Sequence, residues 1–251
     1  MTGGDETSGV SLGAQFLGAF NEIEGHFRDS LQCEERVSFK TMIGTYEQQY
    51  HLTTEQVRAL QAWARLRNAI SHDLYFDGRP IAEPAAQVVD EISKLRDLIL
   101  SPPLLWDCLD RRSVSVTNPG TPIRTVLEMV RLHDYSQVPV YGDKRYVGLL
   151  TTNCIARWLA DRLATSTLGD GEPVQAVMEF AEPHDRAMHI PKTITVAAAI
   201  DLLSQAGADG FRPAALIMTR SGKADESALA VVVDFDLPSL NTALSLPRRA
   251  K

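Results

Sequence analysis

The sequence predicts an α+β protein, in which an N-terminal all-α four-helix bundle precedes a duplicated unit of strands and helices. Three observations support this prediction. Between residues 11 and 100, apolar residues recur at three- and four-residue spacing in four successive stretches. Residues 113–164 instead combine short apolar runs with helical stretches. A degraded copy of that second pattern follows between residues 174 and 246.

The first two helices are expected at about Ser11–Leu31 and Val37–Gln49, after a disordered start at residues 1–9. Each carries an apolar stripe that can be buried against neighbouring helices. The stripe residues are Leu12, Phe16, Phe20, Ile23 and Phe27 in the first helix, and Phe39, Met42, Ile43 and Tyr46 in the second.

The third helix is predicted to begin at a capping box formed by Thr53 and Gln56. The fourth is expected to carry Pro84 in its first turn and to end before Pro102-Pro103. Together the four helices give a bundle over residues 10–101. The stripe residues here are Leu60, Trp63, Leu66 and Ile70, then Val88, Ile92, Leu95 and Ile99.

The composition limits the class of protein. Of the 251 residues, 44% are hydrophobic and 23% are charged, as in a soluble globular protein with a buried core. No apolar run approaches the roughly 20 residues of a membrane-spanning helix, and the first ten residues lack the layout of a secretion signal. The three cysteines lie far apart. We expect a cytoplasmic protein with reduced thiols and no membrane contact.

The net charge of −7 is unevenly distributed, because the first 100 residues carry nine basic and fifteen acidic side chains. An acidic protein has no general electrostatic attraction for phosphate backbones. Binding of nucleic acid would therefore require a local basic patch.

Residues 113–164 predict the order strand, helix, strand, strand, helix. The turn Asn118-Pro119-Gly120 has residue types suited to turn geometry, and Gly142-Asp143-Lys144 is expected to join the second and third strands. The expected elements are a strand at 114–116, a helix at 121–133, strands at 137–141 and 146–150, and a helix from Thr151.

This order, together with Thr121-Pro122-Ile123, Gln137-Val138-Pro139-Val140 and Tyr146-Val147-Gly148-Leu149-Leu150-Thr151, resembles a CBS domain. CBS domains are regulatory modules that work in pairs. Ile123 corresponds to Val196 in the second copy. The resemblance therefore predicts a tandem CBS (Bateman-type) module with domains at residues 104–164 and 174–246, the second having a longer hairpin turn at 220–227.

The resemblance implies that clefts between the paired domains hold an adenine nucleotide such as AMP, ADP or ATP. The family signature is Gly, two apolar residues, Ser/Thr, two variable residues and Asp. Its Asp accepts the ribose hydroxyls and its Thr contacts a phosphate. The first copy keeps Thr151 but has Cys154 at the Asp position. The second keeps Asp236 but has Val233 at the Thr position.

We therefore predict one nucleotide site centred on Asp236 and assisted by Thr193 or Thr195. The alternative is that Asp236 caps the last helix ahead of Pro238 and that the pair is a dimerisation scaffold without a ligand. The other candidate contacts implied by the resemblance are Pro139, Val140 and Thr151.

The end of the third predicted helix, Arg67-Asn68-Ala69-Ile70-Ser71-His72, resembles the motif of the HEPN family. HEPN domains are helical bundles, and many are metal-independent ribonucleases that act as dimers. In such a site His72 would remove the proton of a 2′-hydroxyl, Arg67 would stabilise phosphoryl charge and Asn68 would orient the group. In the alternative, Arg67 pairs with Glu22 or Glu24 on the first helix.

The two resemblances together predict a cytoplasmic homodimer in which a CBS pair senses an adenine nucleotide and controls a HEPN-like bundle. Two alternatives stay open. One is a HEPN-type endoribonuclease acting on RNA and gated by the CBS module, and the other is a ligand-free structural dimer. No metal is predicted, because His184, Asp185 and His189 lie in a Pro-bounded loop without an apparent fourth ligand.

Overall fold

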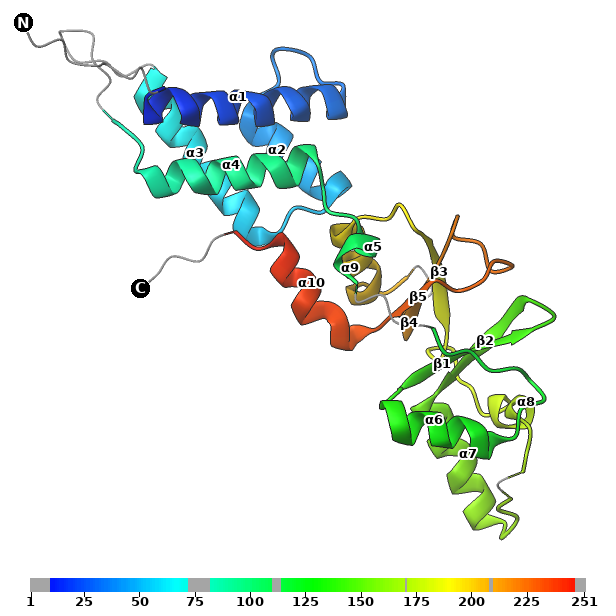
Figure 1. Cartoon of the computed structure of the whole chain (residues 1–251). Coiled ribbons are helices and arrows are strands. Elements are labelled where there is room, and N and C mark those ends of the chain that lie inside the picture. The colour runs from blue at the N-terminus through cyan, green and yellow to red at the C-terminus, as the bar shows by residue number, and fades with distance from the viewer. Residues whose placement is uncertain (1–9, 72–81, 110–113, 170, 208–209, 247–251) are drawn as a thin grey trace, which may run out of the picture. The chain divides into compact units, whose positions relative to one another are not determined.

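The computed structural model of the chain describes residues 10–71, 82–109, 114–169, 171–207 and 210–246 (Figure 1). They form two compact units. The helical unit comprises the chain up to Pro103 together with the segment from Leu244 onward, and the mixed unit spans Leu104–Ala243. The C-terminal segment therefore belongs to the same unit as the N-terminal helices.

The helical unit contains the four predicted helices, α1 to α4. The capping box that begins α3 is confirmed: the Thr53 N–H donates to Gln56 Oε1 at 2.9 Å, and the Gln56 N–H donates to Thr53 Oγ1 at 3.2 Å. Pro84 was expected in the first turn of α4, but that helix begins only after it. The bounds are α1 Leu12–Leu31, α2 Phe39–Tyr50, α3 Thr54–Ser71 and α4 Ala86–Leu100.

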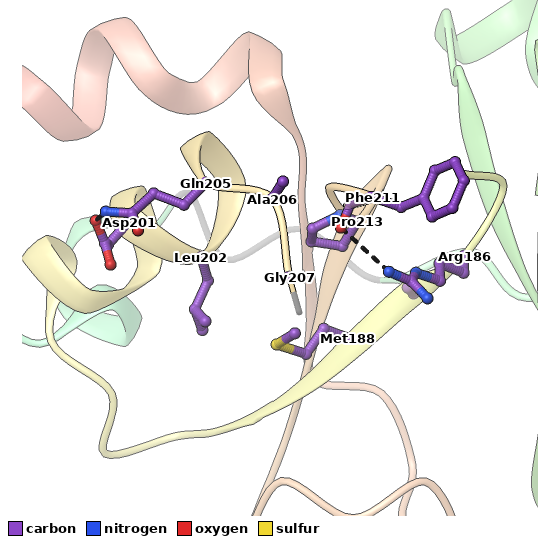
Figure 2. A pocket seen from close by; sticks show the side chains of 10 residues that line it. Arg186, Met188, Asp201, Leu202, Gln205, Ala206, Gly207, Phe211 and Pro213 are labelled. Atoms are coloured by element: carbon purple, nitrogen blue, oxygen red, sulfur yellow. Dashed lines mark hydrogen bonds between the residues drawn. The ribbon is translucent and has the colours of Figure 1, made fainter. Parts of the chain in front are cut away.

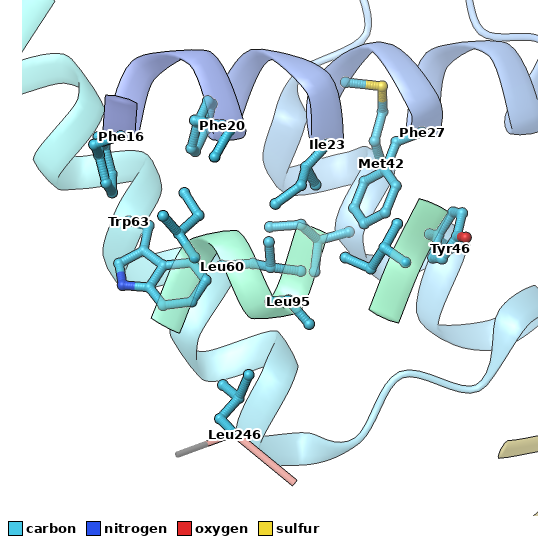
Figure 3. Packing of buried hydrophobic residues seen from close by; sticks show 14 of the residues in the cluster. Phe16, Phe20, Ile23, Phe27, Met42, Tyr46, Leu60, Trp63, Leu95 and Leu246 are labelled. Carbon is cyan, nitrogen blue, oxygen red and sulfur yellow. The ribbon is translucent and has the colours of Figure 1, made fainter. Parts of the chain in front are cut away.

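The core of the helical unit is formed by the predicted apolar stripes and by one residue from the other end of the chain (Figure 3). The stripe of α4 is shifted by one position at its start, because Val89 rather than Val88 is buried. Leu246, only 6% exposed, packs into the same core. The buried Gln56 side chain also donates from Nε2 to the Leu244 carbonyl at 3.2 Å. Gln56, which caps α3, thus also binds the C-terminal segment.

The mixed unit repeats one order of elements twice. In its first half, helix α6 is followed by the antiparallel strands β1 and β2 and then by α7. In its second half, strand β3 and helix α9 are followed by β4, β5 and α10. The bounds are α5 Leu105–Cys108, α6 Ile123–His133, β1 Gln137–Gly142, β2 Arg145–Thr151, α7 Thr152–Ala164, α8 Val174–Met178, β3 Ala187–Pro191, α9 Val196–Ser204, β4 Ala215–Thr219, β5 Ala230–Val232 and α10 Leu237–Leu244.

The two halves also share strand topology. β3 lies parallel to β4, which pairs antiparallel with β5. In the first half Thr117 forms a parallel bridge with Val140 of β1, and β1 pairs antiparallel with β2. The prediction of a strand at 114–116 is therefore wrong, since only an isolated bridge at Thr117 forms. Val116 is 45% exposed, so this segment has little apolar burial to extend the pairing.

The short helix α5, which precedes the first half in sequence, packs with the second half. The short helix α8, which precedes the second half, packs with the first half. The Leu105 N–H donates to the Ile194 carbonyl at 2.9 Å, just before α9. Correspondingly, the Val174 N–H donates to the Thr121 carbonyl at 2.9 Å, just before α6. Leu105 and Val174 are both fully buried. The segment 104–109, assigned by the sequence analysis to the start of the first CBS domain, thus packs as part of the second half.

The hairpin between β4 and β5 joins the halves at another point. It spans residues 220–229, which confirms the longer turn predicted in the second copy. The Ala224 carbonyl within it accepts a hydrogen bond from the Tyr146 N–H of β2 at 3.0 Å. The inserted residues therefore pack against the first half.

We predict that Leu105→Ala lowers the free energy of unfolding of the mixed unit by about 2–5 kcal/mol, because it leaves a cavity in a fully buried position. Val174→Ala should cost about 2 kcal/mol at the corresponding site. Urea unfolding followed by far-UV circular dichroism measures both changes.

Leu104→Ala is the matched control, because Leu104 is 36% exposed and should cost less than about 1 kcal/mol. Equal losses at Leu104 and Leu105 would show that α5 is not an internal part of the second half.

Candidate functional site

The N-terminus of α7 holds the first signature residue, Thr151, which is 4% exposed. Thr151 ends β2 in extended conformation and caps α7: its Oγ1 accepts a hydrogen bond from the Cys154 N–H at 3.0 Å. The same hydroxyl donates to Asp185 Oδ1 at 2.6 Å. The donor that the resemblance assigns to a phosphate is therefore engaged by a carboxylate of the chain itself.

Asp185 is held by three donors and its side chain is 1% exposed. Besides Thr151, the Glu182 N–H donates to Oδ2 at 2.9 Å, and the Arg157 guanidinium forms an ion pair with Oδ2. Burial by itself would raise the pKa of Asp185. The bonds from Thr151 and Glu182, with the positive charge of Arg157, nevertheless hold that pKa below its usual value.

Cys154 occupies the position of the signature Asp and is fully buried. Its thiol lies 3.2 Å from the Val177 carbonyl and donates to it. Burial raises the pKa of the Cys154 thiol to about 11, so the group is neutral at pH 7. It therefore offers neither the charge nor the acceptor strength of a carboxylate toward a ribose.

Asp236, the second signature residue, lies in a short 3-10 turn, Asp234–Asp236, that leads into α10. Its Oδ2 accepts a hydrogen bond from the Val233 N–H at 2.9 Å. This is the arrangement of the predicted capping alternative. Among the described residues, no donor contacts the other oxygen, Oδ1, and Asp236 is half-exposed. Asp236 thus keeps one carboxylate oxygen available.

The remaining predicted contacts are dispersed. Thr195 caps α9 by accepting from the Ala198 N–H at 3.3 Å, and Thr193 is exposed. Pro139 and Val140 are buried within β1. No hydrogen bond between described residues joins Asp236 to either threonine. The predicted residues therefore do not converge on one preformed polar site.

A protein-family model described as "CBS domain" matches residues 107–161. This match covers α6, β1, β2 and most of α7, the elements that carry Thr151 and Cys154. Residues 107–161 are a CBS domain.

Three similar solved structures are also CBS proteins. A CBS-domain containing protein of Agrobacterium tumefaciens is 16% identical, with a TM-score of 0.40 over 56% of this chain and 92% of that one. CBSX2 in complex with AMP is 17% identical, with a TM-score of 0.39 over 56% and 95%. The CBS domain of a bacterial CNNM/CorC family Mg²⁺ transporter is 17% identical, with a TM-score of 0.42 over 76% and 96%. No curated protein matches the chain.

Outside the CBS domain, a hollow of about 560 Å³ lies beside β3 and the end of α9 (Figure 2). Its polar groups bond one another: Arg186 donates to the Phe211 carbonyl at 3.1 Å, and Gln205 donates to Asp201. Of the predicted site residues that the structure describes, none lines it. Other lining residues are Met188, Leu202 and Pro213.

Between the CBS domain and β3 lies an aromatic cluster that the sequence analysis did not single out. The centroid of the Tyr146 ring lies 4.6 Å from that of the His189 ring and 5.8 Å from that of the Tyr141 ring, and both pairs are T-shaped. The Tyr141 hydroxyl, the Thr117 hydroxyl and His189 Nε2 are buried and form no hydrogen bond with a described residue. Burial raises the pKa of Tyr146 to about 12 and lowers that of His189.

In the helical unit, the described part of the Arg67-Asn68-His72 motif is engaged in contacts within the chain. Arg67 Nη2 lies 3.8 Å from Glu24 Oε2 of α1, and Nη1 donates to Asn68 Oδ1 at 3.2 Å. The Arg67 guanidinium also stands 5.8 Å from the centroid of the Phe20 ring. His72 lies outside the described residues. The pairing with Glu24 matches the structural alternative for Arg67.

The described residues contain no group of three or more His, Cys, Asp or Glu side chains placed to hold a metal ion. None of the described helices is both long enough and apolar enough to cross a bilayer.

We predict that His189 makes the fold sensitive to mild acid. Because burial lowers the folded-state pKa of His189 below its ordinary value near 6.5, the unfolded chain takes up a proton first as the pH falls. The free energy of unfolding therefore declines from about pH 6.5 down to the lowered folded-state pKa. Urea unfolding of the wild type and His189→Gln, at about pH 7.5 and about pH 5, measures this difference.

The substituted protein should lose less stability between the two pH values than the wild type does. An identical loss in both proteins would assign the acid sensitivity to other groups.

Proposed function

We propose that residues 174–246 are a second CBS domain and that the chain is a regulatory protein with a tandem CBS module. The repeated strand topology and the reciprocal packing of α5 and α8 support this pairing. In this proposal the helical unit is the HEPN-like output domain. The ligand of the module is an adenine nucleotide, as the resemblance to the family implies.

The observation that carries the proposal is the contrast between the two signature positions. The Thr151 hydroxyl is buried and donates to Asp185, whereas Asp236 is half-exposed and uses one oxygen for the Val233 N–H. A carboxylate oxygen that accepts from ribose hydroxyls is what the signature requires at this place. The neighbouring Phe235 side chain is 89% exposed and supplies an aromatic face on which a base can stack. The nucleotide site is therefore centred on Asp236.

The same helix that follows Asp236 connects the site to the helical unit. α10 begins at Leu237, and its last residue, Leu244, accepts the hydrogen bond from Gln56 of α3. Leu246 follows in the core of the bundle. A nucleotide that binds one conformation of the Asp236 turn better than another shifts the population of α10 conformations, and through Leu246 it acts on the bundle.

The proposed assembly is a homodimer formed through the first CBS domain. Four leucines on α6 and α7 are between 37% and 63% exposed although these helices also supply core residues. Covering these exposed leucines by a second copy would bury apolar surface. The four residues are Leu127, Leu132, Leu159 and Leu163.

Among AMP, ADP and ATP, at least one should bind the wild-type protein, and Asp236→Asn should weaken that binding by about tenfold or more, because a charged acceptor is lost. Isothermal titration calorimetry measures the affinity. At a ligand concentration of about 100 times Kd, the melting temperature should rise by roughly 5 °C. Nucleotide should also slow hydrogen exchange of the Gln56 region of α3 in the wild type but not in Asp236→Asn.

Asp234→Asn is the matched control, since Asp234 is an exposed acid in the same turn and should leave affinity unchanged. No binding of any of the three nucleotides, or equal weakening by both substitutions, would leave the ligand-free scaffold as the better account.

Leu163→Glu should convert the dimer to a monomer of 27.6 kDa, because it places a charge on the proposed apolar contact. Light scattering after size exclusion measures the mass. Leu168→Glu is the control: Leu168 is 51% exposed but follows the end of α7. A monomeric wild type would contradict the proposed assembly.

A further inference from the structure

The segment between α8 and β3 wraps around one guanidinium group of the CBS domain. Arg157 of α7 donates from Nε to the Phe180 carbonyl at 2.8 Å and lies 3.6 Å from a Glu182 carboxylate oxygen. It also forms the ion pair with Asp185. Arg157 therefore binds three points of this segment, and the last of them delivers the Asp185 carboxylate to Thr151.

The groups around the Asp185 carboxylate form an anion site. Oδ1 accepts the Thr151 hydroxyl, while Oδ2 accepts the Glu182 N–H and pairs with Arg157. A hydroxyl, a backbone N–H and a guanidinium are the donor types that also bind a phosphate group. Thr151 lies at the N-terminus of α7, a helix of 13 residues, where the helix dipole adds positive potential.

We propose that Asp185 is an internal ligand that closes the Thr151 position of the first CBS domain to external anions. A phosphate group reaches the Thr151 hydroxyl and the Arg157 guanidinium only when the segment 182–185 leaves them. This inference goes beyond the Asp236 site and does not depend on it, since it concerns the other signature position. It also explains how Thr151 is retained beside Cys154: its hydroxyl binds the chain itself.

The tethered carboxylate has a large advantage over a free anion. Its effective concentration at the site is on the order of millimolar or higher, because residues 182–185 are attached to the same fold. The buried position adds to this, since withdrawing Asp185 leaves the Thr151 hydroxyl without its acceptor and removes the ion pair of Arg157 with Asp185. Inorganic phosphate in the micromolar range therefore does not displace it.

Removal of the carboxylate should open the site. In Asp185→Gly, inorganic phosphate should bind at least about tenfold more tightly than in the wild type, because two charge-assisted donors become available. Calorimetric titration with phosphate, at constant ionic strength set with choline chloride, measures the affinity, and the melting temperature should rise with phosphate in this variant alone.

Two further variants test the assignment. Asp185→Asn fills the volume with a neutral amide and should gain no phosphate binding. Asp185→Gly combined with Thr151→Val should lose the gain, because the hydroxyl donor is removed. If Asp185→Gly binds phosphate no better than the wild type, or if the double variant binds as well as the single one, the proposed anion site is refuted.

A measurement on the wild type decides the matter even if these variants do not fold. In ¹H–¹⁵N spectra of the wild type, the Glu182 amide and the Arg157 Nε–H signals should stay unmoved during titration with micromolar phosphate. Movement of both signals at low phosphate would show that Asp185 does not close the site. Failure of nucleotide to bind at Asp236 would leave these spectra unchanged, so the two proposals are tested separately.

Discussion

The packing of the mixed unit depends on two short helices, α5 and α8, each of which packs against the half that it does not precede in sequence. Val174 and Val177 of α8 complete a core that contains Ile123, Val126 and Trp158 of the first half. Leu105 of α5 is correspondingly fully buried and bonded to the Ile194 carbonyl of the second half. Neither half can bury its own apolar face without a segment supplied from the other side of the repeat. The two halves therefore fold and pack as a pair.

The two residues that the sequence analysis assigned to the CBS signature, Thr151 and Asp236, both take part in helix capping. In a full capping box, the N-cap hydroxyl accepts the N3 amide and the N3 side chain accepts the N-cap amide. The first half keeps only the hydroxyl, from Thr151 to the Cys154 N–H. The second keeps only the carboxylate, from Asp236 to the Val233 N–H. Each position has a backbone partner, so retention of Thr151 or Asp236 does not by itself require a nucleotide.

In the helical unit, too, a candidate site residue contacts other residues of the chain. Arg67 lies on α3 at the place expected from its motif, yet its guanidinium is directed toward Glu24 and the Phe20 ring. The ion pair is partly exposed and contributes little to stability by itself. Its consequence is geometric, since it holds the guanidinium against α1. An enzymatic role for Arg67 would require this contact to be exchanged for a phosphate.

Local periodicity and capping determined much of the architecture from the sequence. The four apolar stripes placed α1 to α4, and the spacing of Thr53 and Gln56 identified the start of α3 because both capping bonds lie within one turn. The repeated order of strands and helices was also readable, since strand and helix periods differ. The strand expected at 114–116 failed, because its pairing depends on burial that its residues do not obtain.

Only the tertiary structure decided which side chains meet. Asp185 stands 34 residues from Thr151, and Leu244 is 188 residues from Gln56, so no local pattern could join them. The sequence alone predicted a CBS-type repeat and identified Thr151 and Asp236 as its candidate signature residues. Whether those residues face a ligand or another part of the chain is set by long-range packing, because a hydroxyl or carboxylate bonds whichever partner the fold brings within about 3 Å.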